Sequence, residues 1–452
     1  MRGGVGDEAE VTMMARRERI AAAVILAAVW GVFVAYAWPG FMTWDSIVQL
    51  GQARSGHYGN WHPPIMARLW AVLDGIVRGP ALMLVLQTSL FVVGLYGVMR
   101  RYAEPRRAAL LAALIFVFPP VFAPMSTIWK DSLMAALVLC AVAGLTSPAR
   151  GWRAAAWVAF VVIAALRHNA PILILPITTM LVPYGAGWPV WRRRVLGAAL
   201  GLAASLVGMA VSRALTEVDN HPFANMLAMQ DVGAVIANAP AMTDAEVNAL
   251  VDGVHVVPAS DIQARLRAIR ATKTSFEEMS QTEGRVFDFV TSDAQAAAMV
   301  HAWERTLAAH PGAYIRYRVG RLLDLLGFSG KRFIPYIMPH SENASLLAQI
   351  GEVRAYAPYQ RAIGHALGRI SRSIMFWPML YFVLAVGLLV ILWRDPLQRG
   401  LLIGALGYEI ALMFLAPGAE YRYSHWLVTC AVIASVVRLV GVARAREAAA
   451  IC

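Results

Sequence analysis

The sequence has few charged residues and few cysteines. Only 15% of its residues are Asp, Glu, Lys or Arg, whereas 59% are hydrophobic, which is far from the balance of a soluble globular protein. Three cysteines are too few for a disulfide framework. Cys140 and Cys430 fall within apolar runs and Cys452 is the last residue, so we assign them no chemistry.

Several signatures of known chemistry are also missing. The sequence has no HExxH motif, no CxxC pair and no Asp-rich loop with ligand spacing, so no metal site is expected. A glycine-rich phosphate loop of the Walker type is absent, which argues against an ATP-driven pump. Segments of alternating polarity, which would indicate a membrane β-barrel, are absent as well, and no internal repeat is present.

Long apolar runs recur along the chain instead. Runs of roughly 17–25 residues are long enough to cross a bilayer as helices, and helices satisfy the backbone polar groups that lipid cannot. The sequence therefore predicts an all-α polytopic membrane protein with about ten transmembrane helices. The expected crossings are 20–37, 81–98, 108–123, 132–145, 154–166, 171–182, 195–211, 374–392, 401–415 and 426–442.

Basic residues gather in alternate loops and predict the orientation. Loops on the cytoplasmic side carry an excess of Lys and Arg, so we expect both termini to be cytoplasmic in a bacterial inner membrane. This pattern accounts for much of the net charge of +12 without a nucleic-acid partner. The first run ends in Ala35-Tyr36-Ala37, which resembles a signal-peptidase site; an uncleaved first helix is preferred. The inner basic residues are Arg100, Arg101, Arg106, Arg107, Arg150, Arg153, Arg192, Arg193, Arg194, Arg394, Arg399, Arg444 and Arg446.

The spacing of the apolar runs divides the chain into three parts. Residues 1–212 form an N-terminal transmembrane module with a first outer loop at 38–80, and residues 373–452 form the last helices and a basic tail. Residues 213–372 carry equal numbers of acidic and basic side chains. Helical spacing at 244–251, 261–271 and 293–309 predicts that they form a mainly helical extracytoplasmic domain.

One segment of this domain is both basic and aromatic. Arg316, Arg318 and Arg321 alternate with Tyr314 and Tyr317. Basic and aromatic side chains on one helix are typical of a helix that lies near lipid headgroups. We therefore expect this helix to lie at the membrane surface.

Two short stretches of the first outer loop, 43–46 and 59–64, together hold an acid, a histidine and two tryptophans. Asp45 and Gln49 would share one face of a helix. Asp45 could act as a helix N-cap or as a base that removes a hydroxyl proton. Trp61 could be an interfacial anchor, and His62 could be a second acid or base, a phosphate donor or a surface residue. Pro64 is suited to begin a helix.

Three further polar clusters are expected on the same side of the membrane. Lys130 and Asp131 follow the third crossing, where the adjacent acid could keep Lys130 charged and available to a phosphate. Arg167 lies between two crossings with little room for a loop, and an arginine within a membrane bundle indicates a functional site. Arg422 precedes the last crossing as a second guanidinium, held by Glu420. Simpler interpretations are snorkelling for Lys130 and helix anchoring for the last cluster.

These motifs resemble one family. The sequence contains an outer-face acid at Asp45, a His62-Pro63-Pro64 step, Lys130-Asp131, Arg167 with Asn169, and Arg422-Tyr423. This combination is similar to the GT-C superfamily of polyprenyl-phosphate-sugar glycosyltransferases, especially the protein O-mannosyltransferase and aminoarabinose transferase group. The resemblance covers residues 44–169 and 421–425. Relatives have an Asp-Glu pair in the first loop, whereas Ser46 follows Asp45 here.

The resemblance implies an inverting glycosyltransferase with a GT-C-like fold. The donor would be a polyprenyl-phosphate-linked sugar, and the acceptor a hydroxyl of a glycan, lipid or protein. Asp45 and His62 would be catalytic, and Lys130, Arg167 and Arg422 would bind the donor phosphate. No cofactor is expected, although a divalent cation is compatible with the site. The sugar or acceptor pocket would be lined by Trp44, Gln49, Trp61, Asp131, His168, Asn169, Glu420, Tyr423 and His425.

A transporter or lipid flippase for a cell-envelope precursor is the alternative. It would use the same charges as a translocation path and would need no base. Transporters of this kind place their substrate sites near the bilayer midplane and often contain inverted repeats. The expected clustering of charges at one face favours the enzyme.

Overall fold

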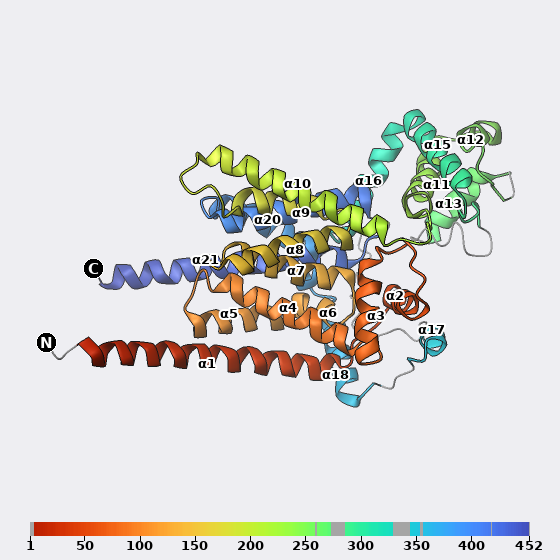
Figure 1. Cartoon of the computed structure of the whole chain (residues 1–452). Coiled ribbons are helices and arrows are strands. Elements are labelled where there is room, and N and C mark those ends of the chain that lie inside the picture. Colours follow the sequence, from red (N-terminus) through yellow and green to blue (C-terminus); the bar gives the residue numbers. More distant parts are fainter. Residues whose placement is uncertain are drawn as a thin grey trace.

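The computed structural model shows a bundle of apolar helices with a second helical unit at one end (Figure 1). It describes residues 4–257, 260–272, 285–328, 344–352, 356–416 and 418–451. The long helices run side by side, and both ends of the chain lie at the left of Figure 1. Helices α2 (Trp44–Ser55) and α3 (Ile65–Ile76) lie at the opposite end, which we call the outer end. Within the described residues the only β-pairings are isolated bridges.

Each of the ten expected crossings falls on a helix or a helix pair of the bundle. Five of these helices are long and apolar enough to cross a bilayer, and the bent pair of α5 and α6 would make a sixth. The chain is thus an all-α polytopic membrane protein, and the number of ten crossings stays a prediction. The bundle helices are α1 (Gly4–Ala37), α4 (Ala81–Met99), α5 (Pro105–Val117), α6 (Pro119–Met125), α7 (Lys130–Leu145), α8 (Arg150–Leu166), α9 (Pro171–Leu181), α10 (Val190–Ala214), α19 (Pro378–Ile391), α20 (Pro396–Leu415) and α21 (His425–Ile451).

The third expected crossing is broken, and the break determines the path of the chain to Lys130. Helices α5 and α6 meet at an angle of 74°. Pro119 and Pro120 follow Phe118, whose backbone is extended, because a residue that precedes proline is driven out of the helical conformation. The short helix α6 then leads the chain across the outer end of the bundle to Lys130 at the start of α7.

Small residues let the bundle helices approach closely. A Cβ added to Gly94 of α4 would lie 2.6 Å from the backbone nitrogen of Cys140 in α7. Likewise, a Cβ on Gly208 of α10 would lie 2.4 Å from the carbonyl oxygen of Val161 in α8. Packing of small residues is the main source of helix association in lipid, where burial of apolar surface gives no advantage. These contacts fix the helices that carry the outer polar clusters.

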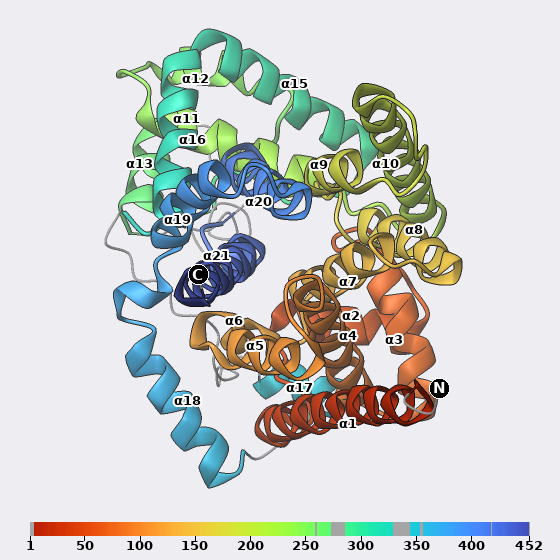
Figure 2. The same ribbon diagram turned by 90° about the vertical axis from the view of Figure 1, so that its left-hand side faces the viewer.

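Short helices cover the outer end of the bundle. As the sequence predicts, α3 begins directly after Pro64. In the view along the bundle, helix α18 (Pro358–Ile370) lies at the periphery, beyond α5 and α6 (Figure 2). Its Gln360 side chain donates to the carbonyl oxygens of Tyr36 at 2.8 Å and Trp38 at 2.9 Å. The other short elements near this end are α17 (Ala344–Gln349), the 3-10 helix Ile374–Phe376 and the 3-10 helix Tyr421–Ser424.

The inserted domain is helical and has its own hydrophobic core. The core includes Val232, Ile236, Leu266 and Phe287, each fully buried, and the three helices expected from the sequence are α12, α13 and α15. The stretches 273–284 and 329–343 of the expected domain lie outside the described residues. The elements are the π-helix Phe223–Ala228, α11 (Met229–Asn238), α12 (Asp244–Leu250), α13 (Ile262–Thr272), α15 (Asp293–Ala309) and α16 (Pro311–Leu325).

The expected headgroup role of the arginines on α16 is wrong for Arg318. This side chain is 1% exposed and pairs with Asp231 of α11 at 2.6 Å. Its Nη1 also donates to the carbonyl oxygen of Met413 in α20. Asp231 has no exposed surface and accepts a second hydrogen bond from Trp303 at 2.9 Å. Arg318 therefore joins the inserted domain to the bundle. An unpaired buried charge is strongly destabilising, so the guanidinium is paired with Asp231 rather than placed at lipid headgroups.

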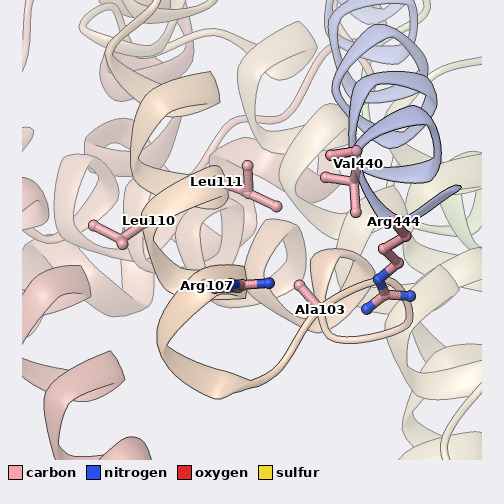
Figure 3. A pocket seen from close by; sticks show the side chains of 7 residues that line it. Ala103, Arg107, Leu110, Leu111, Val440 and Arg444 are labelled. Atoms are coloured by element: carbon pink, nitrogen blue, oxygen red, sulfur yellow. The ribbon is translucent and has the colours of Figure 1, made fainter. Parts of the chain in front are cut away.

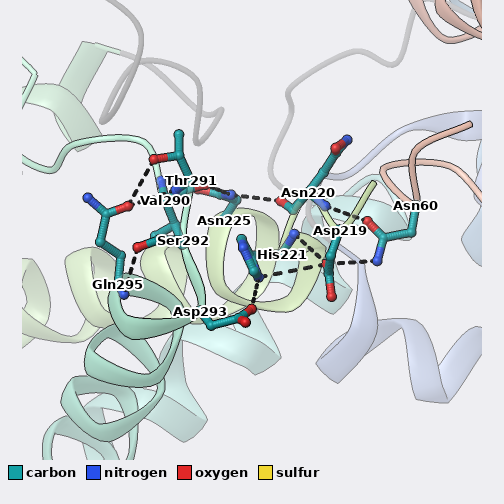
Figure 4. A network of polar contacts seen from close by, with 10 residues as sticks. All are labelled: Asn60, Asp219, Asn220, His221, Asn225, Val290, Thr291, Ser292, Asp293 and Gln295. Atoms are coloured by element: carbon teal, nitrogen blue, oxygen red, sulfur yellow. Dashed lines mark hydrogen bonds and ion pairs between the residues drawn. The ribbon is translucent and has the colours of Figure 1, made fainter. Parts of the chain in front are cut away.

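Hydrogen bonds also join the first outer loop to the inserted domain (Figure 4). The Asn60 amide donates to Asp219 at 2.8 Å and accepts from the backbone N–H of Asn220 at 2.7 Å. Beyond this link, Asn225 exchanges two hydrogen bonds of 2.9 Å with the backbone of Val290. The loop that carries His62 is thus held against the domain.

Candidate functional site

Asp45 lies in the first turn of α2 at the outer end of the bundle. Its carboxylate accepts a hydrogen bond from Arg422 and lies 3.7 Å from Nε2 of His62. The N-cap of α2 is Thr43, whose N–H donates to the hydroxyl of Ser46 at 3.2 Å. The capping interpretation of Asp45 is therefore wrong, since its carboxylate turns towards a cation.

The charges around Asp45 keep it ionised. Burial alone would raise the pKa of its carboxyl, but the charges of Arg422 and Lys130 outweigh burial and hold the pKa well below its usual range. A base must be ionised to accept a proton, and Asp45 meets this condition at neutral pH. While Arg422 remains bound to it, however, the carboxylate is a weak base.

His62 is buried beside both Asp45 and Lys130. Its side chain is 3% exposed, and Nδ1 lies 3.0 Å from Nζ of Lys130. Burial and the charge of Lys130 lower the pKa of His62 to about 3, so the ring is neutral at physiological pH. A neutral ring can accept a hydrogen bond from the Lys130 ammonium at Nδ1, which fixes the direction of the lysine side chain. Burial and the charge of Arg167 lower the pKa of Lys130 to about 7, so an anion bound beside it would favour its charged form.

Arg167 pairs with Asp131; the Asp131 side chain is buried, and that of Arg167 is 12% exposed. This pairing corrects the expectation that the adjacent Asp131 would hold Lys130. Successive residues at the start of a helix point in different directions, so Asp131 faces Arg167 while Lys130 faces His62. The Arg167 guanidinium also lies 5.5 Å from the ring centre of Tyr423, within the range of a cation–π contact.

Arg422 lies at the centre of the cluster. Its Nε is 2.6 Å from Glu420, as expected from the sequence, and it also donates to Asp45. Its guanidinium lies 5.2 Å from the ring centres of Trp129 and Tyr423. The Tyr423 ring thus contacts both Arg422 and Arg167. The site contains three cations with three carboxylates, contributed by segments far apart in the sequence.

Three other expected pocket residues lie close to this cluster. Trp44 is 39% exposed, and its ring meets that of His62 edge-on at 6.1 Å. Gln49 is buried, and its amide donates to the backbone carbonyl of Asp45 at 3.0 Å. The Trp61 ring packs at 5.6 Å against Phe289 of the inserted domain. Trp44 is therefore the residue of these three that a ligand in solution could reach most easily.

The remaining expected residues differ in their accessibility. His168 is exposed and Asn169 is partly buried, next to Arg167 in the loop between α8 and α9. His425 is 1% exposed and stacks on Phe91 of α4, with ring centres 6.1 Å apart. Its side chain points into the bundle, so the structure does not bring it to the charge cluster.

Two residues of this region were not among the expected site residues. Trp129 donates from Nε1 to the Thr43 hydroxyl at 2.8 Å and lies under Arg422; its place beside Lys130 in the sequence was the available signal. Glu409 of α20 is fully buried and accepts a hydrogen bond of 2.6 Å from Ser424. A single carboxylate in an otherwise apolar run is a signal of function. No group of metal-ligating side chains occurs among the residues that the structure describes.

The chain shows only limited similarity to known proteins. No model of a protein family and no curated protein matches the chain. The structure is similar to two crystal structures of ArnT from Cupriavidus metallidurans, one bound to undecaprenyl phosphate and one in the apo state. Identity is 14% and 15%, the TM-scores are 0.32 and 0.33, and each match covers 92% of this chain and 77% of that chain. Similarity at this level does not establish a shared activity, so the function is inferred from the residues of the site.

Proposed function

We propose that the chain is an inverting membrane glycosyltransferase of the GT-C type. It would move a sugar from a polyprenyl-phosphate donor to an acceptor hydroxyl at the outer face of the bacterial cytoplasmic membrane. One observation supports this proposal above all: Asp45 shares a single cluster with Lys130, Arg167 and Arg422 at the outer end of an apolar bundle. An acid beside several cations suits a reaction that removes a proton and releases a phosphate.

The proposed reaction is a single displacement at the anomeric carbon of the donor sugar. The acceptor oxygen attacks the anomeric carbon and forms the new glycosidic bond, while the bond from that carbon to the phosphate oxygen breaks. The hydroxyl proton passes to the Asp45 carboxylate, and the electrons of the broken bond leave with the polyprenyl phosphate. Attack from the face opposite the leaving group inverts the anomeric centre. Negative charge grows on the phosphate in the transition state, where nearby cations stabilise it.

The pairing of Arg422 suggests how donor binding would activate the base. Arg422 contacts two carboxylates, Asp45 and Glu420. A phosphate offers the guanidinium a competing acceptor with a geometry suited to two parallel hydrogen bonds. Transfer of Arg422 to the phosphate would leave Asp45 with a higher pKa and hence a greater affinity for the hydroxyl proton.

Lys130 and Arg167 would act as further phosphate ligands, but they differ in how many of their hydrogen-bond donors are already used. Lys130 is held by a neutral histidine and keeps protons of its ammonium group free for an anion. Arg167 is bound to Asp131, so it would contribute mainly through its charge unless that pair opens. His62 would therefore direct Lys130, and Trp44 would form part of the sugar or acceptor pocket.

Binding of undecaprenyl phosphate tests the first half of the proposal. Purified protein in lipid nanodiscs would be titrated with undecaprenyl phosphate, comparing wild type with Lys130→Gln and with the control Arg316→Gln, which removes an exposed cation of the inserted domain. We expect weaker binding for Lys130→Gln alone. Equal affinity in all three proteins would contradict the phosphate role of Lys130.

Product formation tests the second half. Polyprenyl-phosphate sugars with a radiolabelled sugar would be supplied to proteoliposomes together with membrane extracts as the source of acceptor. A labelled glycosidic product is expected. Label that crosses the vesicle membrane with no such product would instead favour the alternative of a transporter or flippase.

A further inference from the structure

A pocket lies at the end of the bundle opposite the charge cluster, where both chain termini are found (Figure 3). It has a volume of about 220 Å³ and lies between α5 and the last turns of α21. Apolar side chains and two arginines form its walls. It is lined by Ala103, Arg107, Leu110, Leu111, Val440, Ala443 and Arg444.

The two arginines face each other across the pocket from different helices. Figure 3 shows Arg107 of α5 and Arg444 of α21 on opposite sides of the opening. Both are exposed, and no carboxylate in the described part of the chain forms an ion pair with either. By contrast, the nearby Arg100 donates to the carbonyl oxygen of Ala103. Two guanidinium groups without an internal anion are available to an external one.

The apolar side of the pocket continues along α5. Leu110, Leu114 and Val117 are 48%, 65% and 47% exposed, and their spacing of four and three residues places them in one stripe on the helix. The stripe runs from the pocket towards the middle of the bundle. A ligand that uses both features would have an anionic head between the arginines and an aliphatic chain along the stripe.

We propose that this pocket binds an anionic phospholipid of the leaflet on the side of the termini, with its phosphate between Arg107 and Arg444. Basic pockets between membrane helices on the cytoplasmic side bind anionic headgroups, and positive loops place this end on that side. A free phosphate would use the arginines but not the stripe. The proposal does not depend on the glycosyltransferase activity, because the pocket and the charge cluster lie at opposite ends of the bundle.

Lipid binding to matched variants tests the site. Detergent-purified wild type would be titrated with phosphatidylglycerol and with phosphatidylcholine of the same acyl chains, and bound lipid counted by native mass spectrometry. We expect preferential binding of phosphatidylglycerol, weakened about fivefold by Arg107→Gln or Arg444→Gln and on the order of 30-fold by both, as follows from the interaction of one basic residue with an anionic lipid surface. Arg106→Gln is the control, because Arg106 is an exposed neighbour outside the pocket.

Three outcomes would overturn the proposal. Equal binding of the two lipids would show that the charge of the headgroup has no role. An equal loss of phosphatidylglycerol binding in Arg106→Gln would show a general effect of surface charge. Complete displacement of the lipid by inorganic phosphate would show a free-anion site. Leu111→Trp fills the pocket without changing its charge, so it should also weaken phosphatidylglycerol binding; unchanged binding in this variant would contradict the site even if the arginine variants did not fold.

Discussion

Asp45 accepts a hydrogen bond from Arg422, although 377 positions separate the two residues in the sequence. The contact joins the first outer loop to the segment before the last bundle helix. It also places the expected base and an expected phosphate ligand in one ion pair. Each residue therefore affects the charge and the hydrogen bonds of the other, and a substitution at either one is expected to alter the role of both.

Asp45→Asn should abolish most of the transfer activity while leaving donor binding largely intact. The amide cannot accept the hydroxyl proton, and loss of a general base typically lowers turnover by about 10²–10⁴-fold. Turnover and undecaprenyl phosphate affinity would be measured on the same preparation. Glu304→Gln, which alters an exposed carboxylate of the inserted domain, should leave turnover unchanged. Near-normal turnover in Asp45→Asn would rule out its role as the base.

Arg422→Gln should move the acid limb of the pH–rate profile to higher pH. The charge of Arg422 is the largest influence that lowers the pKa of Asp45, so its removal raises that pKa towards the ordinary carboxyl range or above it. Asp45 then becomes protonated at a higher pH, and activity is lost earlier on acidification. The pH dependence of kcat/KM measures this shift, because it reports groups of the free enzyme. A profile that only falls in height, with no shift, would mean that Asp45 is not the group observed.

Removal of one partner of the Arg167–Asp131 pair should destabilise the protein. Asp131 is buried and Arg167 is only 12% exposed, and an uncompensated buried charge costs about 3–5 kcal/mol. Asp131→Asn alone should lower the unfolding temperature, whereas Asp131→Asn combined with Arg167→Gln should regain much of it. If the double variant is stable but binds undecaprenyl phosphate more weakly, Arg167 has a role in binding as well as in folding. Normal stability of the single variant would show that the pair is open in the membrane.

The stability of the wild type should fall on acidification from about pH 6.5 towards pH 3, partly because of His62. The folded-state pKa of His62 is lowered from 6.5 to about 3, so the unfolded chain binds a proton in this range and the folded chain does not. The free energy of unfolding therefore decreases as the pH falls through this window. His62→Gln should lose stability less steeply in a series of thermal unfolding measurements. Identical slopes for the two proteins would show that His62 is not buried in neutral form.

Arg318→Met should loosen the inserted domain from the bundle. This change leaves Asp231 buried without its cation and removes the hydrogen bond to Met413, and breaking such a pair costs about 3–5 kcal/mol. Limited proteolysis should cleave the domain faster than in wild type. Arg316→Met is the matched control, because Arg316 is exposed on the same helix. Equal cleavage rates in both variants would contradict the proposed junction.

Much of the architecture could be predicted from the order of apolar and basic residues. Each expected crossing lies on a helix or a helix pair, because an apolar run in lipid must satisfy its backbone polar groups within helices. The break between α5 and α6 shows that length and hydropathy do not reveal where such a run bends. Helix α3 begins after Pro64 as expected, since proline is suited to the first turn. The same arguments could not foresee that Arg318 is buried, because the composition of a helix does not reveal the carboxylate that will face it.

The sequence by itself determined the types of residues at the site and the side of the bundle on which they lie. Charged residues make up only 15% of the chain, so clusters of them between apolar runs are conspicuous, and alternation of crossings assigns each cluster to one end. Only the tertiary structure decided the pairing: Asp45 with Arg422, Lys130 with His62, and Arg167 with Asp131. The physical reason is that ion pairs depend on distances of a few ångströms between separate helices, and these distances follow from helix packing and side-chain direction rather than from position along the chain.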